Sequence, residues 1–186
     1  MASVLIPLAT GFEELEAVTL IDLLTRAGAK VTSAGLQPGP VTASRGVVIL
    51  PTTTLDAVME QTFDLIVLPG GLPGADNLNS DQRIHTLLQR QQQQGKLIAA
   101  ICAAPKVLHH LGLLAGRQAT AYPGVLEALN ANTATTLRSD SVVCDGNIVT
   151  SRGPATAMEF ALTLITLLFG KERRDSVANG LLYATS

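Results

Sequence analysis

The chain has 186 residues, which is enough for one domain with a core of its own. Hydrophobic residues make up 47% of the sequence and charged residues only 15%, so we expect a partner subunit to cover part of the surface. The formal net charge is −2 and there is no basic cluster, so nucleic acid is not expected as the main partner.

Membrane and secretory signals are also missing from the sequence pattern. No apolar run reaches the roughly 20 residues that a membrane-spanning helix needs. Residues 1–9 are apolar but lack the charged start of a signal peptide, and we interpret them as a first strand. Two cysteines make no disulfide framework, so a reducing cytoplasm is the expected compartment.

Buried strands and helices are predicted to alternate along the chain. The predicted strands are residues 4–8, 30–34, 47–50, 64–68, 97–101 and 118–121, with a strand pair around Asp145-Gly146-Asn147. The predicted helices are residues 13–27, 55–60, 81–94, 105–110, 154–169 and 171–183. This alternation predicts a mostly parallel sheet with helices on both faces. The working site is then expected beyond the carboxyl ends of the strands, at loops 9–12, 70–74 and 102–105.

Cys102 lies between the buried run Leu97–Ile101 and Pro105, which suits the first turn of a helix. The cysteine is therefore expected where a strand turns sharply into a helix. The positive end of a helix favours thiolate over thiol, which predicts a lowered pKa and a reactive sulfur. The segment alone leaves a second interpretation open, in which Cys102 is a buried structural residue.

Glu16 lies in the first predicted helix, four residues from both Phe12 and Leu20. Loss of water on such an apolar stripe would raise the pKa of its carboxyl group. A protonated glutamate could donate a hydrogen bond to a thiolate and later move protons. The alternative, which also explains Glu13 and Glu14, is favourable negative charge in a first helical turn.

The segment Pro69-Gly70-Gly71 follows a predicted strand. Its glycines would let backbone N–H groups approach a reacting oxygen, although a plain turn would use glycines as well. The segment matches neither a phosphate loop nor a dinucleotide fingerprint. The three histidines lack ligand spacing with a cysteine or carboxylate, so no metal is expected.

Several motifs occur in register from residue 4 to about residue 183. They are Gly11-Phe-Glu-Glu-Leu-Glu-Ala-Val, Arg26-Ala-Gly, Ser44-Arg-Gly-Val, Val67-Leu-Pro-Gly-Gly, Leu97-Ile-Ala-Ala-Ile-Cys-Ala-Ala-Pro and Thr150-Ser-Arg-Gly-Pro-Ala-Thr. Together they resemble the ThiJ/PfpI superfamily, and most closely the branch of Parkinson disease protein 7 and its bacterial relatives. The resemblance implies a flavodoxin-like three-layer α/β sandwich, a single domain over residues 1–186 and a homodimer.

The resemblance also implies roles for individual residues. Cys102 matches the nucleophile of the family and Glu16 its protonated glutamate. The binding residues that it implies are Gly71 and Ala103 at the oxyanion positions, Gly70 beside them, Arg45 and Arg152 near the pocket and the subunit contact, where they would bind anionic groups, and Tyr122. Arg26 matches a position at the dimer interface.

Two departures from the family pattern bear on activity. Peptidase members place a histidine directly after the cysteine, and Ala103 stands there, so peptidase activity is not expected. The Parkinson-related branch often has a histidine where this chain has Tyr122. A phenol is a poor base near neutral pH, which leaves the acid–base work to Cys102 and Glu16.

The resemblance implies a cofactor-independent glyoxalase or deglycase that acts on methylglyoxal, glyoxal or their early adducts with amines and thiols. A sensor of oxidative stress, or a redox-regulated chaperone, is the alternative, with Cys102 oxidised to sulfinate. Two further alternatives are a binding or structural relative without chemistry, and a role in thiamine-related metabolism that only the family's historical name suggests.

Overall fold

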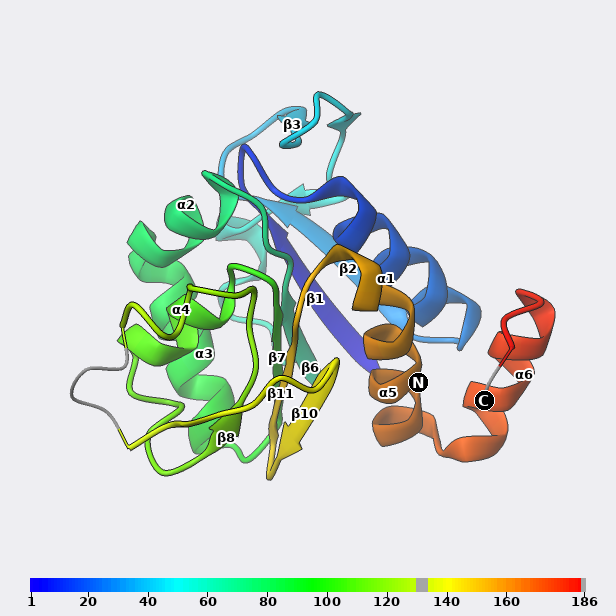
Figure 1. Ribbon diagram of the computed structural model, residues 1–186. Helices are drawn as coiled ribbons and strands as arrows, with labels where there is room; N and C mark the ends of the chain where they lie inside the picture. Colours follow the sequence, from blue (N-terminus) through cyan, green and yellow to red (C-terminus); the bar gives the residue numbers. More distant parts are fainter. Residues whose placement is uncertain (130–133, 185–186) are drawn as a thin grey trace.

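The computed structural model describes residues 1–129 and 134–184, and a seven-stranded sheet runs through its centre (Figure 1). The strand order is β10-β11-β7-β6-β1-β2-β5. Neighbouring strands are parallel except β10 and β11, which form the antiparallel pair expected around Gly146. The bounds are β1 (Ser3–Leu8), β2 (Lys30–Gly35), β5 (Thr53–Thr54), β6 (Leu65–Leu68), β7 (Leu97–Ile101), β10 (Val142–Asp145) and β11 (Ile148–Ser151). Short separate pairs join β3 (Val41–Thr42) to β4 (Val48–Ile49) and β8 (Gln118–Ala119) to β9 (Thr136–Leu137).

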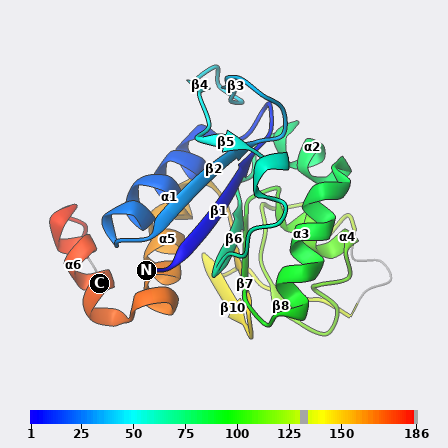
Figure 2. The same ribbon diagram turned by 180° about the vertical axis from the view of Figure 1, so that it is seen from behind.

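Helices cover both faces of this sheet, as expected from the sequence (Figures 1 and 2). One face carries α1 (Glu14–Arg26) and α5 (Ala157–Phe169), and α6 (Lys171–Gly180) packs on α5. The other face carries α2 (Gly74–Ser80), α3 (Gln82–Gln93) and α4 (Pro105–His110). Short 3-10 helices cover Asp56–Val58 (η1) and Pro154–Thr156 (η3). None of the helices in the described part of the chain is long and apolar enough to cross a membrane.

The central strands are apolar on both sides because each side faces a helical layer. Along β1, Val4, Ile6 and Leu8 belong to the core beneath α1 and α5, whereas Leu5 belongs to the core beneath α3 and α4. All four side chains are fully buried. This alternation follows from the period of two residues in a strand.

Helix α2 is the main element that the sequence prediction missed, because residues 70–74 were expected as a loop and nothing was assigned to the segment that follows. Aspartate, asparagine and serine are poor helix formers, and the segment Gly74–Ser80 contains all three. Contacts with α4 hold it instead. Asp76 pairs with Lys106, and the Asn79 amide oxygen lies 2.9 Å from His110 Nδ1.

Other predicted elements differ from the structure in extent. The helix expected over residues 55–60 is only the 3-10 turn Asp56–Val58, and the strand expected over 118–121 ends at Ala119. The apolar helix expected from Pro154 begins as a 3-10 turn and becomes α-helical at Ala157.

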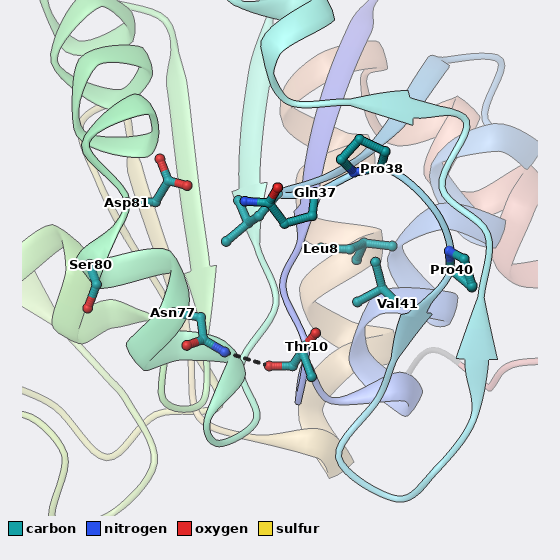
Figure 3. Close-up of a pocket in the computed structure, with 10 residues that line it drawn as sticks. Leu8, Thr10, Gln37, Pro38, Pro40, Val41, Asn77, Ser80 and Asp81 are labelled. Carbon is teal, nitrogen blue, oxygen red and sulfur yellow. Dashed lines mark hydrogen bonds between the residues drawn. The ribbon is translucent and has the colours of Figure 1, made fainter.

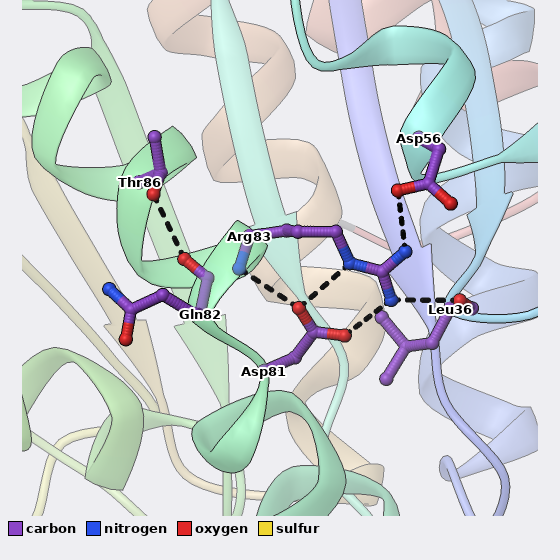
Figure 4. A network of polar contacts seen from close by, with 6 residues as sticks. All are labelled: Leu36, Asp56, Asp81, Gln82, Arg83 and Thr86. Carbon is purple, nitrogen blue, oxygen red and sulfur yellow. Dashed lines mark hydrogen bonds and ion pairs between the residues drawn. The ribbon is translucent and has the colours of Figure 1, made fainter.

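Arg83 fastens the start of α3 to two segments at the edge of the sheet (Figure 4). Its guanidinium group donates to both carboxylate oxygens of Asp81, to Asp56 Oδ1 at 2.7 Å and to the Leu36 carbonyl oxygen at 2.9 Å. Asp81 also caps α3 by accepting the Arg83 backbone N–H at 2.9 Å. The loop after β2, η1 and α3 are thereby held together.

Candidate active site

Cys102 lies at the carboxyl end of β7, where the parallel strands open toward a cleft. Its φ of 63° is left-handed, which is uncommon for a residue other than glycine and marks a sharp turn between β7 and α4. Two hydrogen bonds hold this elbow. The Cys102 N–H donates to the Ser151 carbonyl oxygen at 3.0 Å, and the Tyr122 N–H donates to the Cys102 carbonyl oxygen at 2.9 Å. The predicted strand-to-helix elbow is therefore present.

Glu16 lies beneath this elbow and is completely buried. Its Oε2 accepts the backbone N–H of Gly70 at 2.7 Å, and its carboxyl group also interacts with the Cys102 thiol. Gly70 must be a glycine, because a Cβ there would lie 2.7 Å from the Cys102 Cβ and 2.9 Å from Glu16 Oε2. The structure therefore brings Cys102 and Glu16 together as predicted.

Gly70 has a different part in the site from the one expected. The sequence placed it among the residues that bind a reacting oxygen. Its N–H is instead committed to Glu16 Oε2, because the buried carboxyl group needs a donor there. Gly70 is a positioning residue for Glu16.

The N–H groups of Gly71 and Ala103 face the Cys102 sulfur and are the donors available to an oxyanion. Gly71 has a φ of 87°, and a Cβ on it would lie 2.4 Å from the Glu13 backbone nitrogen and 2.5 Å from the Gly11 carbonyl oxygen. Its backbone is thus packed tightly against the loop between β1 and α1. A donor held so closely needs little reorganisation when charge develops on a bound oxygen.

The ionisation of Cys102 and Glu16 is coupled. Burial raises the pKa of Glu16 from its ordinary 4.5 to about 7. Burial and then the Glu16 carboxylate raise the pKa of Cys102 to about 12, against the lowering effect of the Gly71 and Ala103 N–H groups. The prediction that the helix terminus lowers the pKa of Cys102 is therefore wrong while Glu16 is charged. Above about pH 7 the pair carries one negative charge, which lies mainly on Glu16 because the pKa of Cys102 is the higher of the two, and a thiolate forms only when the remaining proton moves from Cys102 to Glu16.

A cleft of about 310 Å³ opens over Cys102. It is lined by Glu13, Ser44, Arg45, Gly71, Leu72, Cys102, Ala103, Tyr122, Val125 and Pro154. Arg45 and Tyr122, two of the expected binding residues, line this cleft. Glu13 and Ser44 were not proposed as site residues, although the Ser44 hydroxyl donates to Glu13 Oε2 at 3.0 Å. Only the position of Ser44 next to Arg45 in a shared motif could have indicated it.

The other two arginines lie elsewhere. Arg152 follows β11 and is half-buried, with its N–H donating to Ser141, and it does not line the cleft in the described part of the chain. Arg26 is exposed at the last turn of α1, where it pairs with Asp22 at 2.9 Å. Its implied part in a subunit contact stays a prediction.

A second hollow, of about 350 Å³, lies between α2 and the loop after β2 (Figure 3). Leu8 and Val41 contribute apolar surface, and Asn77 Nδ2 donates to the Thr10 carbonyl oxygen at 2.9 Å across it. It contains neither Cys102 nor Glu16, and we therefore assign the chemistry to the smaller cleft. Among the described residues, no group of three or more His, Cys, Asp or Glu side chains is placed to hold a metal ion.

Comparison with known proteins gives consistent matches over most of the chain. A model of the DJ-1/PfpI family matches residues 2–167. Protein dj-1beta of Drosophila melanogaster is 48% identical over 183 residues, which cover 98% of this chain and 97% of that protein. A Caenorhabditis elegans protein named glutathione-independent glyoxalase DJR-1.2 is 38% identical over 172 residues, with coverage of 92% and 91%.

Some relatives are longer, and the solved structures agree with the fold. The match with protein DJ-1 homolog A of Arabidopsis thaliana covers 97% of this chain but only 46% of that protein, at 47% identity. The structure of Toxoplasma gondii DJ-1, described as oxidized, has a TM-score of 0.94 at 42% identity, and the match covers 100% of both chains. The flavodoxin-like sandwich expected from the sequence is confirmed.

Proposed function

The chain belongs to the DJ-1/PfpI family, and we propose that it is a cofactor-independent glyoxalase or deglycase. Its substrates would be methylglyoxal, glyoxal or their early adducts with amines and thiols. The observation that carries the proposal is the Cys102 sulfur, which has the buried Glu16 carboxyl group beneath it and two backbone N–H groups facing it. A relative named as a glutathione-independent glyoxalase supports the reaction class.

The first step joins the substrate to the enzyme. The Cys102 thiolate adds to the aldehyde carbon and forms a C–S bond, while the carbonyl π electrons move to the oxygen. The Gly71 and Ala103 N–H groups stabilise that oxyanion. Glu16, which has taken the proton of Cys102 and holds it at this stage, gives that proton to the oxygen. The product of this step is a neutral hemithioacetal next to a carboxylate.

The second step moves hydrogen from one carbon to its neighbour. The Glu16 carboxylate removes the proton from the former aldehyde carbon, and the electrons of that C–H bond form a carbon–carbon double bond while the neighbouring carbonyl oxygen becomes an enediolate oxygen. The hydroxyl proton of the first carbon passes to that oxygen, Glu16 returns its proton to the adjacent carbon, and the first carbon regains a carbonyl bond, so the hemithioacetal becomes a 2-hydroxyacyl thioester. Water then cleaves the C–S bond and releases a 2-hydroxy acid, and Cys102 and Glu16 regain one shared proton. These reaction steps consume water but need no oxidant, reductant or cofactor.

Other residues of the cleft would assist binding. Arg45 is exposed at the edge of the cleft, where its guanidinium group can attract the carboxylate of the product. Tyr122 stands where related proteins often have a histidine, and we assign it no proton transfer. Ala103 follows the nucleophile without a histidine, so we do not propose peptidase activity.

The test is an aldehyde assay with the purified chain in the absence of glutathione. Methylglyoxal is expected to be converted to lactate, which proton NMR would follow directly. Conversion in deuterium oxide separates the steps, because the proton carried by Glu16 exchanges with solvent and would leave deuterium on the second carbon. Loss of methylglyoxal without any hydroxy acid would show only adduct formation and would contradict the proposal.

A second candidate function, a sensor of oxidative stress or a redox-regulated chaperone, uses the same sulfur. A Cys102 sulfinate would accept hydrogen bonds from the Gly71 and Ala103 N–H groups and from protonated Glu16. Cys144, in contrast, is exposed on β10. The structure of Toxoplasma gondii DJ-1 that is described as oxidized supports this candidate.

Mild peroxide is expected to add two oxygen atoms to Cys102 and not to Cys144, as measured by peptide mass spectrometry. The expected selectivity follows from the stabilisation that only the Cys102 site offers an anionic sulfur. Glu16→Leu, which cannot donate a hydrogen bond, should lower the yield of sulfinate. Equal oxidation of both cysteines would remove the basis for a sensor.

We also propose that residues 1–186 form a single domain that works as a homodimer in the cytoplasm. Leu15 and Val18 are about half exposed on α1, and Val48 in β4 and Leu50 directly after it are more exposed. Apolar side chains gathered on these two segments favour a contact with a second copy. Two free cysteines fit a reducing compartment.

A further inference from the structure

The cleft over Cys102 contains two sets of side chains with different chemistry. Glu13, Ser44 and Arg45, which come from the loops after β1 and β3, are polar or charged. Leu72, Tyr122 and Val125, which follow β6 and β8, form what we call the apolar side. The apolar side is next to the reacting groups along the backbone. Leu72 follows Gly71 in the chain, and the Tyr122 N–H donates a hydrogen bond to the Cys102 carbonyl oxygen.

The apolar side leaves large hydrophobic surfaces in water beside the nucleophile. Leu72 is 58% exposed and Tyr122 is 52% exposed, and Val125 is half-buried. Covering such surface with an apolar group of a ligand is favourable, because the water around both surfaces is released. A ligand without apolar groups would gain none of this stabilisation.

The position of the apolar side relative to Cys102 is fixed by the backbone. The Tyr122 N–H donates to the Cys102 carbonyl oxygen at 2.9 Å, and the Val125 N–H donates to the Tyr122 carbonyl oxygen at 3.0 Å. The Tyr122 ring lies against Gly153, where a Cβ would be only 3.4 Å from Tyr122 Cδ2. The backbone at Tyr122 and Val125 is thereby held beside the nucleophile, so little of it needs ordering when a ligand binds.

This inference rests on the proposed function and names its substrate class. We propose that Leu72, Tyr122 and Val125 bind the substituent of a 2-oxoaldehyde, and that aryl or branched alkyl oxoaldehydes are preferred over glyoxal. The aldehyde carbon would bond to the Cys102 sulfur and its oxygen would meet the Gly71 and Ala103 N–H groups. The substituent on the neighbouring carbonyl carbon would then contact the apolar side.

The test compares kcat/KM for glyoxal, methylglyoxal and phenylglyoxal, each divided by its rate of addition to a free thiol in solution. The corrected values should rise along this series, with about 10-fold or more between the first and the last. Leu72→Ala and Tyr122→Ala should lower the corrected ratio of phenylglyoxal to glyoxal about 10-fold, whereas Tyr122→Phe should keep it. Leu182→Ala, at a 94% exposed leucine outside the cleft, is the matched control and should change neither ratio nor rate.

A second readout does not depend on turnover. Alkylation of Cys102 by N-phenyliodoacetamide should be faster than by iodoacetamide once corrected for solution reactivity, and Tyr122→Ala should remove the difference. Turnover that depends on Cys102 but shows no rise along the series would overturn the inference and leave the proposed function in place. If no aldehyde is consumed, the proposed function fails, and the alkylation rates decide: an aryl preference supports the inference and equal rates overturn it.

Discussion

Cys102→Ser is expected to lower the turnover of methylglyoxal by about 1,000-fold or more, to the limit of detection. The serine hydroxyl has nearly the size of the thiol but does not ionise near neutral pH. Glu16 can share its proton with a thiolate, but it is far too weak a base to ionise a hydroxyl group. The backbone donors Gly71 and Ala103 remain, so the variant should still bind the aldehyde weakly without converting it.

The matched control for this variant is Cys144→Ser, which changes the other cysteine on β10 and should leave turnover intact. Circular dichroism and thermal unfolding would show whether both variants keep the fold. Substantial turnover by folded Cys102→Ser would mean that another group starts the reaction, and the proposed mechanism would then be wrong.

Glu16→Gln is expected to make stability less sensitive to pH. The folded chain holds the Glu16 proton up to about pH 7, whereas the unfolded chain releases it near 4.5. Between these values the folded state binds more protons, so the free energy of unfolding falls as pH rises and reaches its lower level above about pH 7. The rise of the Glu16 pKa from 4.5 to about 7 corresponds to a fall of about 3 kcal/mol in the free energy of unfolding across this pH range. Glutamine cannot ionise and should avoid this loss.

Urea unfolding of both proteins at about pH 4.5 and about pH 8 measures this effect, and the stability of Glu16→Gln relative to the original chain should rise between the two. Glu159→Gln, at an exposed glutamate on α5, controls for the removal of one charge. A stability difference that stays constant over this pH range would show that folding does not raise the pKa of Glu16.

The sequence predicts the central features of this site because they depend on local pattern. A buried apolar run followed by cysteine and then proline predicts the elbow at Cys102, and apolar neighbours at helical spacing indicate that Glu16 loses water. Both features depend on residues close in the chain. The parallel sheet then brings them together, since the carboxyl ends of β1, β6 and β7 meet at one edge.

Features that depend on tertiary contacts could not be predicted in the same way. The pKa of Cys102 is set by burial and by Glu16, a residue distant in sequence, and a helix of six residues does not outweigh these effects. The N–H of Gly70 donates to Glu16 and is not available to another acceptor, which only the three-dimensional arrangement reveals. Helix α2 has the composition of a loop and owes its form to contacts with α4.

The most direct test of the coupled Cys102–Glu16 pair is the pH dependence of the alkylation rate of Cys102 by iodoacetamide, in the original chain and in Glu16→Gln. In the original chain we expect the rate to reach a plateau above about pH 7, when the pair has lost one proton, and to rise again toward pH 12 as the second is lost. Glu16→Gln should show one step without the plateau. A single step near the ordinary cysteine pKa of about 8.5 in both proteins would contradict the coupling and the mechanism that depends on it.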